Sequence, residues 1–485
     1  MSAQHFDPRA VLESLGVVGV NGVRCDSRRI RKGDLFAAFP GESADARRFI
    51  PQAIERGAAA VLWEADGFCW NSDWSVPNAP VRGLREKLGY IAAQIYGDAS
   101  RRMWVCGVTG TNGKTSCSHW IAQALTRLGR PTAVIGTLGI GFPGALTPGE
   151  RTTPDAAAIQ EELADLHARG AQGAAMEVSS HGLDQGRVNG VTFAVALFTN
   201  LSRDHLDYHG TMEQYGAAKA KLFAFPGLQH AVVNVDDPFG VQLAEGIAAS
   251  RVSLLRYGLG KGDVAGHRLD LSSRGLKLEI TTPWGPAALR SQLLGGFNAL
   301  NLLGVLAVLL TAGVSLRDAA DALAQLDPVA GRLQLLREPN RPLVVIDYAH
   351  TPDALQKVLE TLRSLLPPAG RLICVFGCGG DRDPGKRPLM GEVATRLADV
   401  AVVTSDNPRS EPPLAIIEDI VAGAHSSYHI EPDRALAIRY ALTNRGPDDI
   451  VLLAGKGHEA YQEIGDQRLP FSDLEVAQAV LKATN

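Results

Sequence analysis

"VCGVTGTNGKTS" (residues 105–116) is the stretch that decides the fold of this 485-residue chain. An apolar run ends in a glycine-rich turn, and a lysine and a threonine then open a helical pattern. This order predicts a strand, a phosphate-binding loop and a helix, because glycines let backbone N–H groups turn toward phosphate oxygens. Lys114 can reach the outer phosphates and the Thr115 hydroxyl can hold Mg²⁺. The general phosphate-loop pattern G-x-x-x-x-G-K-[ST] has its first glycine where this chain has Val108, so Gly110 and Gly113 must supply the flexibility. The less favoured alternative is a plain turn between a strand and a helix.

Apolar runs and helical patterns alternate along the chain, which predicts an α/β fold of mostly parallel sheets covered by helices on both faces. Two breaks in the alternation divide the chain into three predicted domains. Residues 1–98 form a small α/β domain, and residues 99–330 form a central parallel-sheet domain of the P-loop ATPase kind. In residues 331–485 the alternation restarts as a Rossmann-like, doubly wound domain.

The composition argues against several classes of partner and location. The 48 basic and 52 acidic residues give a net charge of -4, which gives no support to a nucleic-acid partner. Six cysteines without a C-x-x-C pair are typical of reduced thiols in the cytoplasm. The N-terminus has no signal-peptide pattern. The longest apolar stretch, residues 298–314, contains two asparagines and predicts a buried helix, so we expect a cytoplasmic protein without membrane insertion.

Lys219 is predicted to face inward. At about 100° per residue of helix, it shares a face with Tyr215, Leu222 and other apolar side chains, while Lys221 points the opposite way. A bare ammonium on an apolar face is costly, so it needs an acidic partner or chemical conversion. The alternative is a lysine whose stem follows the core and whose head reaches water.

Two further segments predict metal ligands. Glu177 ends an apolar strand, where open α/β sheets place residues that contact ligands, and with Thr115 it could hold Mg²⁺. A helix or loop cap is the alternative. The segment "DHLDYH" (204–209) is dense in potential ligands and, taken alone, would also suit a zinc hydrolase.

Charged residues follow three apolar strands of the last predicted domain. Arg382, Asp406 and the pair Gly455 and Glu459 each come directly after such a strand. Since the carboxyl ends of parallel strands meet at one edge, these residues are predicted to form one pocket with both charges. Isolated surface-loop charges are the alternative. The stretch "TSDNPRSE" (404–411) lies at this edge and reads either as a turn or as a rigid claw for a ligand that carries both charges.

Together with the loop, further segments resemble the Mur ligase family, in that family's order and over nearly the whole chain. They are "DSRRIRKGDLF" (26–36), "ERTTP" (150–154), "MEVSSHGLDQGRV" (176–188), "TNLSRDHLDYHG" (199–210), "GGFNALN" (295–301), "IDYAHTPDAL" (346–355) and "GGDRDPGKRPLMG" (379–391). The T-T-P and D-N-P-R segments are similar to the branch that adds the third residue of the peptidoglycan stem peptide.

This resemblance implies a reaction. A carboxylate of UDP-N-acetylmuramoyl-L-alanyl-D-glutamate would attack the γ-phosphate of ATP, and the amine of meso-2,6-diaminopimelate would displace phosphate from the acyl phosphate. It also implies two Mg²⁺ sites, CO₂ for carbamylation of Lys219, a monomer, and a place in peptidoglycan precursor synthesis. No general base stands out.

The resemblance also assigns residues to each ligand. Lys114, Lys219 and His205 would be catalytic, and Thr115, Glu177, His205 and carbamylated Lys219 would hold metal. ATP would contact Gly110, Thr111, Asn112, Gly113, Lys114, Thr115, Ser116, Asn301, Arg332, Asp347 and His350. The uridine-nucleotide substrate would contact Cys25, Ser27, Glu42, Ser43, Ala44, Thr152, Thr153, Ser179, Gln185 and Arg187. Diaminopimelate would contact Arg382, Asp406, Asn407, Pro408, Arg409, Gly455 and Glu459.

Other functions stay open at this point. A lysine-adding ligase of the same family should lack an arginine at position 409, and a folylpolyglutamate synthetase would not need the first domain. A nucleotide-dependent switch needs the phosphate loop but gives no reason for Lys219, Arg382 and a third-domain pocket.

Overall fold

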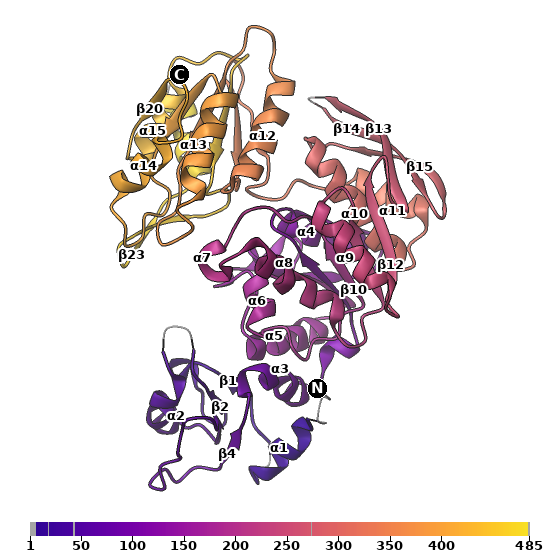
Figure 1. Ribbon diagram of the computed structural model, residues 1–485, viewed down its shortest axis with the longest axis vertical. Helices are drawn as coiled ribbons and strands as arrows, with labels where there is room; N and C mark the ends of the chain where they lie inside the picture. The colour runs from indigo at the N-terminus through magenta and orange to yellow at the C-terminus, as the bar shows by residue number, and fades with distance from the viewer. Residues whose placement is uncertain (1–5, 18, 42–43, 273, 484–485) are drawn as a thin grey trace.

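Three α/β domains follow one another along the long axis of the computed structural model, which describes residues 6–17, 19–41, 44–272 and 274–483 (Figure 1). The first domain lies at one end of the molecule and the third at the other. The predicted fold class is confirmed. The domain boundaries at residues 98 and 330 remain predictions.

The first domain is a small parallel sheet with helices on both faces. Its strands pair in the order β1-β2-β3-β4. They are β1 (Val23–Arg24), β2 (Leu35–Ala38), β3 (Ala60–Glu64) and β4 (Asn78–Val81). The helices are α1 (Pro8–Ser14), α2 (Ile50–Glu55) and α3 (Leu84–Ile95). Asp7 accepts a hydrogen bond from the Arg9 N–H and so caps α1, which also has a proline in its first turn.

The central domain is built on a sheet that has eleven strands in the described residues, in the order β15-β14-β13-β12-β11-β10-β5-β9-β6-β7-β8. They are β5 (Trp104–Thr109), β6 (Thr132–Gly136), β7 (Gly139–Phe142), β8 (Ala145–Thr147), β9 (Gly173–Glu177), β10 (Val195–Phe198), β11 (His230–Asn234), β12 (Ser253–Leu259), β13 (Val264–Ser272), β14 (Gly275–Thr282) and β15 (Gly285–Ser291). The strands from β6 to β13 in this order pair in parallel, and β7-β8 and β14-β15 extend the sheet antiparallel at its two ends. The sequence predicts the parallel part but not these extensions.

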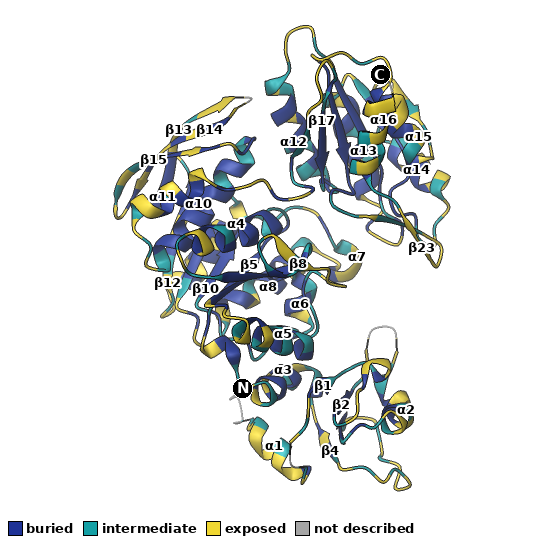
Figure 2. Cartoon of the chain, turned by 180° about the vertical axis from the view of Figure 1, so that it is seen from behind, coloured by how far each residue is buried: buried dark blue, intermediate teal, exposed yellow. Residues whose placement is uncertain are grey.

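Helices cover both faces of this sheet. They are α4 (Lys114–Arg127), α5 (Ala156–Ala168), α6 (Ser180–Asp184), α7 (Leu206–His209), α8 (Met212–Ala220), α9 (Pro238–Ala248), α10 (Gly296–Thr311) and α11 (Leu316–Ala324). One core lies between the sheet and α4, α10 and α11, and a second lies between the sheet and α5, α6 and α9. The central strands of the sheet are accordingly dark blue, meaning buried, in Figure 2, whereas the strands at its two ends are partly exposed.

Helix α10 occupies the apolar stretch that the sequence analysis predicts to be a buried helix. All of its residues from Asn301 to Leu310 are buried, which confirms that prediction. Among the described residues, no helix has the length and apolar character needed to cross a membrane.

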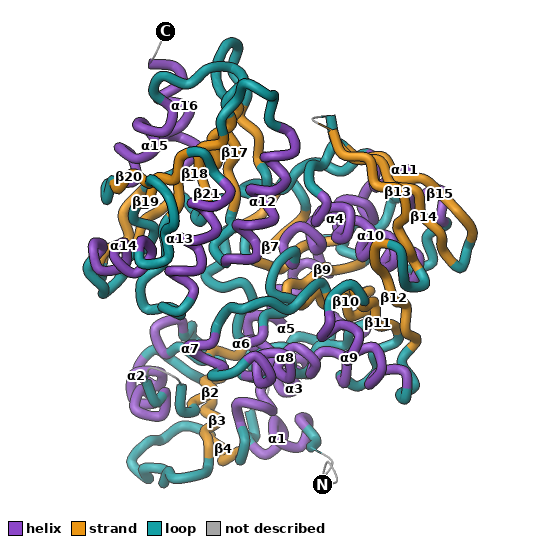
Figure 3. Tube along the Cα trace, turned by 45° about the horizontal axis from the view of Figure 1, so that its top comes forward, coloured by secondary structure: helices purple, strands orange, loops and turns teal. Residues whose placement is uncertain are grey.

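The third domain is doubly wound, with the strand order β16-β17-β21-β18-β19-β20 and a separate β22-β23 hairpin. Its strands are β16 (Gln334–Leu336), β17 (Leu343–Asp347), β18 (Leu372–Phe376), β19 (Val400–Val403), β20 (Tyr428–Ile430), β21 (Ile450–Ala454), β22 (Tyr461–Ile464) and β23 (Gln467–Pro470). The helices are α12 (Pro352–Leu365), α13 (Lys386–Leu397), α14 (Pro413–Val421), α15 (Arg434–Leu442) and α16 (Asp473–Ala483). Helices α12, α13 and α14 pack on one face and α15 and α16 on the other, an arrangement that can be followed in Figure 3.

Polar contacts and shared apolar residues join the domains. Arg24 of β1 donates to Glu161 of α5, and the first domain's core also takes in Ala156 and Ala157 of α5. At the other joint Arg203 donates two hydrogen bonds to Asp383, at 3.0 and 3.2 Å. These contacts place the first and third domains against the central one.

The buried ion pair between Arg434 and Asp473 gives a prediction about stability. Both side chains have no exposed area, two hydrogen bonds of 2.8 and 2.7 Å join them, and Arg434 also donates to the carbonyl of Ala454. Asp473→Ala leaves a buried cation unpaired, so we expect it to cost the third domain about 3–5 kcal/mol.

The control is Glu279→Ala, which removes the partner of exposed Arg268 and should cost about 0–1 kcal/mol. Urea unfolding followed by far-UV circular dichroism measures both variants. Equal losses in the two would contradict the prediction.

Candidate active site

The phosphate loop connects β5 to α4, as the sequence predicts. Gly110 has φ +150° and Gly113 has φ +87°, in the region that favours glycine. A Cβ at Gly110 would lie 1.9 Å from Thr199 Oγ1, and one at Gly113 would lie 2.6 Å from Asn301 Oδ1. Val108 is a buried residue of β5 and precedes the turn, so the glycine missing from the general pattern is not needed there.

The segment directly after β10 holds this loop through both its backbone and its side chains. The N–H of Thr111 donates to the Asn200 carbonyl at 2.8 Å, and the Asn112 N–H donates to Asn200 Oδ1 at 2.9 Å. Thr199 Oγ1 donates to the Asn112 carbonyl at 2.6 Å. The residues after β10 thus hold the loop, and Ser116 is buried in the first turn of α4.

Two lysines meet at this loop. Lys114 Nζ donates to the carbonyls of Gly110 and Thr111, each at 2.9 Å, and Lys219 Nζ donates to the same Gly110 carbonyl at 2.8 Å. Burial lowers the pKa of both ammonium groups, and for Lys219 the nearby Lys114 lowers the pKa further. A larger share of Lys219 is therefore neutral at a given pH than of an exposed lysine.

Lys219 faces inward, which confirms that prediction. Its side chain is 1% exposed and lies 4.2 Å from the centre of the Tyr215 ring, whereas Lys221 is exposed and pairs with Asp184. Within the described residues Lys219 forms no ion pair, so its head neither reaches water nor meets a carboxylate.

Glu177 and Thr115 lie in direct contact at the carboxyl end of the central sheet. The Thr115 hydroxyl donates to Glu177 Oε2 at 3.0 Å, and Thr137 donates to the same carboxylate through its N–H and its hydroxyl. Glu177 is fully buried. Carboxylate and hydroxyl oxygens are ligands that suit Mg²⁺, so these residues fit that ion.

His205 lies beside Asp204 on the loop after β10. His205 Nε2 is 3.3 Å from Asp204 Oδ2, and burial lowers the pKa of His205 to about 3. The ring is therefore neutral near pH 7, which is the form that binds metal ions. In the part of the chain that the structure describes, no group of three or more His, Cys, Asp and Glu side chains is placed to hold a metal ion.

The residues predicted for the rest of ATP line the joint between the second and third domains. Arg332 donates to Thr115 Oγ1 at 2.9 Å and lies 4.4 Å from the centre of the Tyr348 ring. His350 Nε2 is 3.8 Å from Asp204 Oδ2. Asp347 ends β17 and accepts from the N–H groups of Leu333 and Ala349, while burial raises its pKa.

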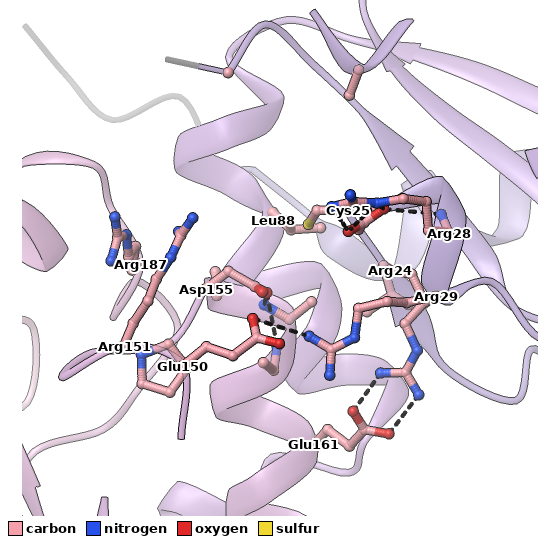
Figure 4. A pocket seen from close by; sticks show the side chains of 18 of the residues that line it. Arg24, Cys25, Arg28, Arg29, Leu88, Glu150, Arg151, Asp155, Glu161 and Arg187 are labelled. Atoms are coloured by element: carbon pink, nitrogen blue, oxygen red, sulfur yellow. Dashed lines mark hydrogen bonds and ion pairs between the residues drawn. The ribbon is translucent and has the colours of Figure 1, made fainter. Parts of the chain in front are cut away.

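A cavity of about 870 Å³ opens between the first and second domains (Figure 4). Of the residues predicted to bind the uridine nucleotide, it is lined by Cys25, Ser27, Ala44, Gln185 and Arg187. Its wall is rich in arginine, and Figure 4 labels Arg24, Arg28, Arg29, Arg151 and Arg187 among the lining residues. Glu42 and Ser43 lie outside the described residues.

The other predicted nucleotide-substrate residues lie between this cavity and Glu177. Arg187 donates to the Thr153 carbonyl at 2.9 Å, and Thr153 Oγ1 donates to the Glu177 carbonyl at 2.9 Å. Thr152 contacts Thr137 through its hydroxyl, at 3.0 Å. Ser179 caps α6 by accepting from the Gly182 N–H, so it has a structural role as well.

Thr152 and Thr153 followed by Pro154 predict, from the sequence, that a helix starts at the proline, and the structure corrects this start. Helix α5 begins at Ala156, and its cap is Asp155, whose carboxylate accepts from the N–H groups of Ala157 and Ala158. Asp155, two residues after Thr153, is thus the N-cap in place of the threonines, because aspartate is preferred over threonine at that position. Pro154 lies before the helix.

Two of the three strand ends of the third domain meet, those that carry Asp406 and the pair Gly455 and Glu459, whereas a shared pocket that includes Arg382 remains a prediction. Asn407, directly after Asp406, donates to Glu459 Oε2 at 2.9 Å, and a Cβ at Gly455 would lie 2.5 Å from Asp406 Oδ2. Arg382 is exposed and donates to the Asp381 carbonyl.

Arg409 follows Pro408 and has φ +53°, a left-handed conformation that is rare outside glycine. Its Nε donates to Glu463 Oε2 at 2.9 Å, and its Nη1 donates to the Gly380 carbonyl at 2.7 Å. The β22-β23 hairpin, which contributes Glu463, thus holds the side chain of this arginine in place.

Sequence reasoning missed three contributors to the site. Asp204 is 5% exposed and lies near His205, His350 and Lys386, and its position beside His205 was the available signal. The Arg203–Asp383 pair and Glu463 gave no local signal, because their partners are distant in sequence.

Models of known protein families match three successive segments of this chain. Residues 19–96 match the model described as "Mur ligase family, catalytic domain", residues 108–309 the "Mur ligase middle domain", and residues 331–457 the "Mur ligase, glutamate ligase domain". The chain therefore belongs to the Mur ligase family, which confirms the predicted resemblance.

Individual relatives cover nearly the full length. A UDP-N-acetylmuramoyl-L-alanyl-D-glutamate–2,6-diaminopimelate ligase of Chromobacterium violaceum is 55% identical over 480 residues, 99% of this chain and 97% of that protein. The ligase of the same name from Neisseria meningitidis serogroup A is 51% identical over 461 residues, 94% of each chain.

A solved structure of a ligase with this name has a TM-score of 0.69 at 38% identity and covers 96% of this chain and 95% of that chain. A Mycobacterium tuberculosis folylpolyglutamate synthase, at 19% identity and a TM-score of 0.64, covers 76% of this chain and 92% of that one and shares the fold.

Proposed function

We infer that this chain is an ATP-dependent ligase that adds meso-2,6-diaminopimelate to UDP-N-acetylmuramoyl-L-alanyl-D-glutamate in peptidoglycan precursor synthesis. The observation that carries this inference is the 55% identity, over 99% of the chain, to a ligase with that name. The arrangement of the three domains supports it, because each joint carries residues suited to one ligand. This activity serves cell wall biogenesis, and the protein acts as a cytoplasmic monomer.

The reaction has two steps, and both gather negative charge. A carboxylate of the dipeptide's glutamate attacks the γ-phosphorus, ADP leaves, and an acyl phosphate forms. The amine of diaminopimelate then attacks the acyl carbon and releases phosphate, with loss of a proton from the nitrogen. Lys114 stabilises the charge on the phosphoryl oxygens, and the backbone N–H groups of the loop orient the phosphates.

The metal-binding residues fall into two groups. Thr115 and Glu177 hold one Mg²⁺, and His205 with carbamylated Lys219 holds a second. When bound, these ions neutralise phosphate charge. The lowered pKa of Lys219 supports carbamylation, because the neutral amine is the form that attacks CO₂. The carbamate would also supply the anion that this buried side chain otherwise lacks.

The three substrates bind at three different places in the molecule. The arginine-rich cavity takes the uridine nucleotide, and the contacts through Arg187 and Thr153 lead from it to Glu177. ATP lies between the second and third domains beside Arg332, Asn301, Asp347 and His350. Diaminopimelate binds at the third-domain pocket, where Arg409 clamps its distal carboxylate and Glu459 accepts from its distal ammonium.

Phosphate release tests the activity directly. With Mg-ATP present, release should require both the UDP-muramoyl dipeptide and an amino acid, and diaminopimelate should be strongly preferred over lysine or ornithine offered separately. Chelation of Mg²⁺ by EDTA should abolish it. Equal turnover with lysine would overturn the specificity, and release without the dipeptide would overturn the ligase assignment.

Lys219→Ala tests the carbamate. The variant should lose activity by about 10²-fold or more, because the second metal loses an oxygen ligand. Formate or acetate should partly restore the rate by supplying a carboxylate in the space that is left. The matched control is Lys221→Ala, two residues away on the exposed side, which should retain full activity. Unchanged activity in Lys219→Ala would remove this lysine from the site.

Arg409→Ala tests the origin of specificity. The variant should lower kcat/KM for diaminopimelate by about 10²-fold, since a charged, two-bonded contact is lost, while any rate with lysine changes little. Exposed Arg439 of α15 offers the control Arg439→Ala, which should match the native enzyme. Retention of the full preference for diaminopimelate in Arg409→Ala would refute the clamp.

A further inference from the structure

Another buried lysine, Lys456, lies beside Asn407 and Glu459 and takes no part in the reaction described above. It follows β21 in the turn between Gly455 and Gly457, and its side chain has no exposed area. Its Nζ donates to Asn407 Oδ1 at 3.0 Å and to Glu459 Oε2 at 2.9 Å. Lys456 therefore contacts two of the residues proposed to bind the amino-acid substrate.

These contacts determine which way the Asn407 amide points. The Lys456 ammonium can only donate, and the second partner of Asn407 Oδ1 is the backbone N–H of Glu463, at 3.0 Å, which also only donates. The amide oxygen must face these two donors. The amide nitrogen is then turned to Glu459, to which it donates at 2.9 Å.

The same contacts orient the Glu459 carboxylate. Both of its hydrogen bonds within the described residues, from Lys456 and from Asn407, fall on Oε2. Its side chain is 12% exposed, so the carboxylate is nearly enclosed and cannot reorient freely. This leaves the acceptor capacity of Oε1 for an ammonium group outside the protein.

We propose that Lys456 is a positioning residue for the amino-acid substrate: it fixes Asn407 and Glu459 in the orientation in which Glu459 Oε1 accepts the substrate ammonium. This proposal rests on the proposed function, because it concerns the same pocket. Lys456 touches neither the substrate nor the reacting atoms, and it acts through the two side chains that it holds.

A purely structural role makes a different prediction. Lys456 also lies 5.6 Å from the centre of the Tyr461 ring, so it contributes to packing against the β22-β23 hairpin. Loss of packing alone would weaken the fold and lower kcat for every substrate together. Loss of positioning raises KM for the amino acid and leaves the KM values for ATP and the UDP-muramoyl dipeptide unchanged.

The test is steady-state kinetics of Lys456→Met, which keeps most of the length of the side chain, one atom shorter, and removes its charge and donors. We expect KM for diaminopimelate to rise by about tenfold or more, with the other two KM values within about twofold of native. In a Glu459→Gln background the same substitution should add less than about threefold, because its effect passes largely through that carboxylate. Exposed Lys482 of α16 provides the control Lys482→Met, which should leave all three constants unchanged.

The possible outcomes separate the two proposals. If the native protein shows no release of phosphate that depends on diaminopimelate, the proposed function fails. If the native protein is active and Lys456→Met keeps its KM for diaminopimelate, or loses as much in the Glu459→Gln background as in the native one, the positioning role fails. If Lys456→Met does not fold, Lys456→Gln replaces it, because glutamine keeps a neutral donor. This variant is expected to show the same selective rise in KM for diaminopimelate. An equal change in all three KM values of Lys456→Gln would also overturn the positioning role.

Discussion

The carbonyl oxygen of Gly110 accepts hydrogen bonds from two lysines, and much of the central site depends on that shared acceptor. Lys114 comes from the helix after the phosphate loop and Lys219 from α8, about a hundred residues later in the chain. Because these ammonium groups lie close together and desolvation lowers the pKa of each, they cannot both be as strongly protonated as lysines in water. The loop can bring them together only because Gly110 has no side chain where Thr199 lies.

Charged side chains of both signs surround these two lysines. Glu177 and Asp204 are buried carboxylates near these lysines, and both raise the pKa of Lys114 while burial lowers it. Arg332 reaches this centre from the third domain through the Thr115 hydroxyl. The proposed active site is therefore a small set of opposite charges at the edge of the central sheet, which Arg332 joins from the third domain.

The sequence predicts a large part of this fold and site, for identifiable reasons. Hydrophobic periodicity is local, so it places Lys219 on the inner face of its helix and Glu177 at the end of its strand. It does not give the antiparallel strands at the two ends of the central sheet. Strands β7 and β8 are only four and three residues long, which leaves little periodicity to read. Strand β14, in contrast, alternates between buried and exposed residues over most of its eight positions, a signal that was present in the sequence and was missed. Nor does periodicity give the cap of α5, where Asp155 outcompetes the nearby threonines. Pairs such as Arg203 and Asp383 form only through the docking of two domains, and no local pattern encodes that docking.

The shared helix α5 has a consequence for how the chain can be divided. Its first turn contributes Ala156 and Ala157 to the core of the first domain. One turn later, Glu161 accepts a hydrogen bond from Arg24 of β1. A fragment that begins at residue 99 would expose that apolar turn to water and leave the Glu161 carboxylate without its guanidinium. A cut between the first two domains is therefore expected to destabilise both sides, although the chain passes only once between them.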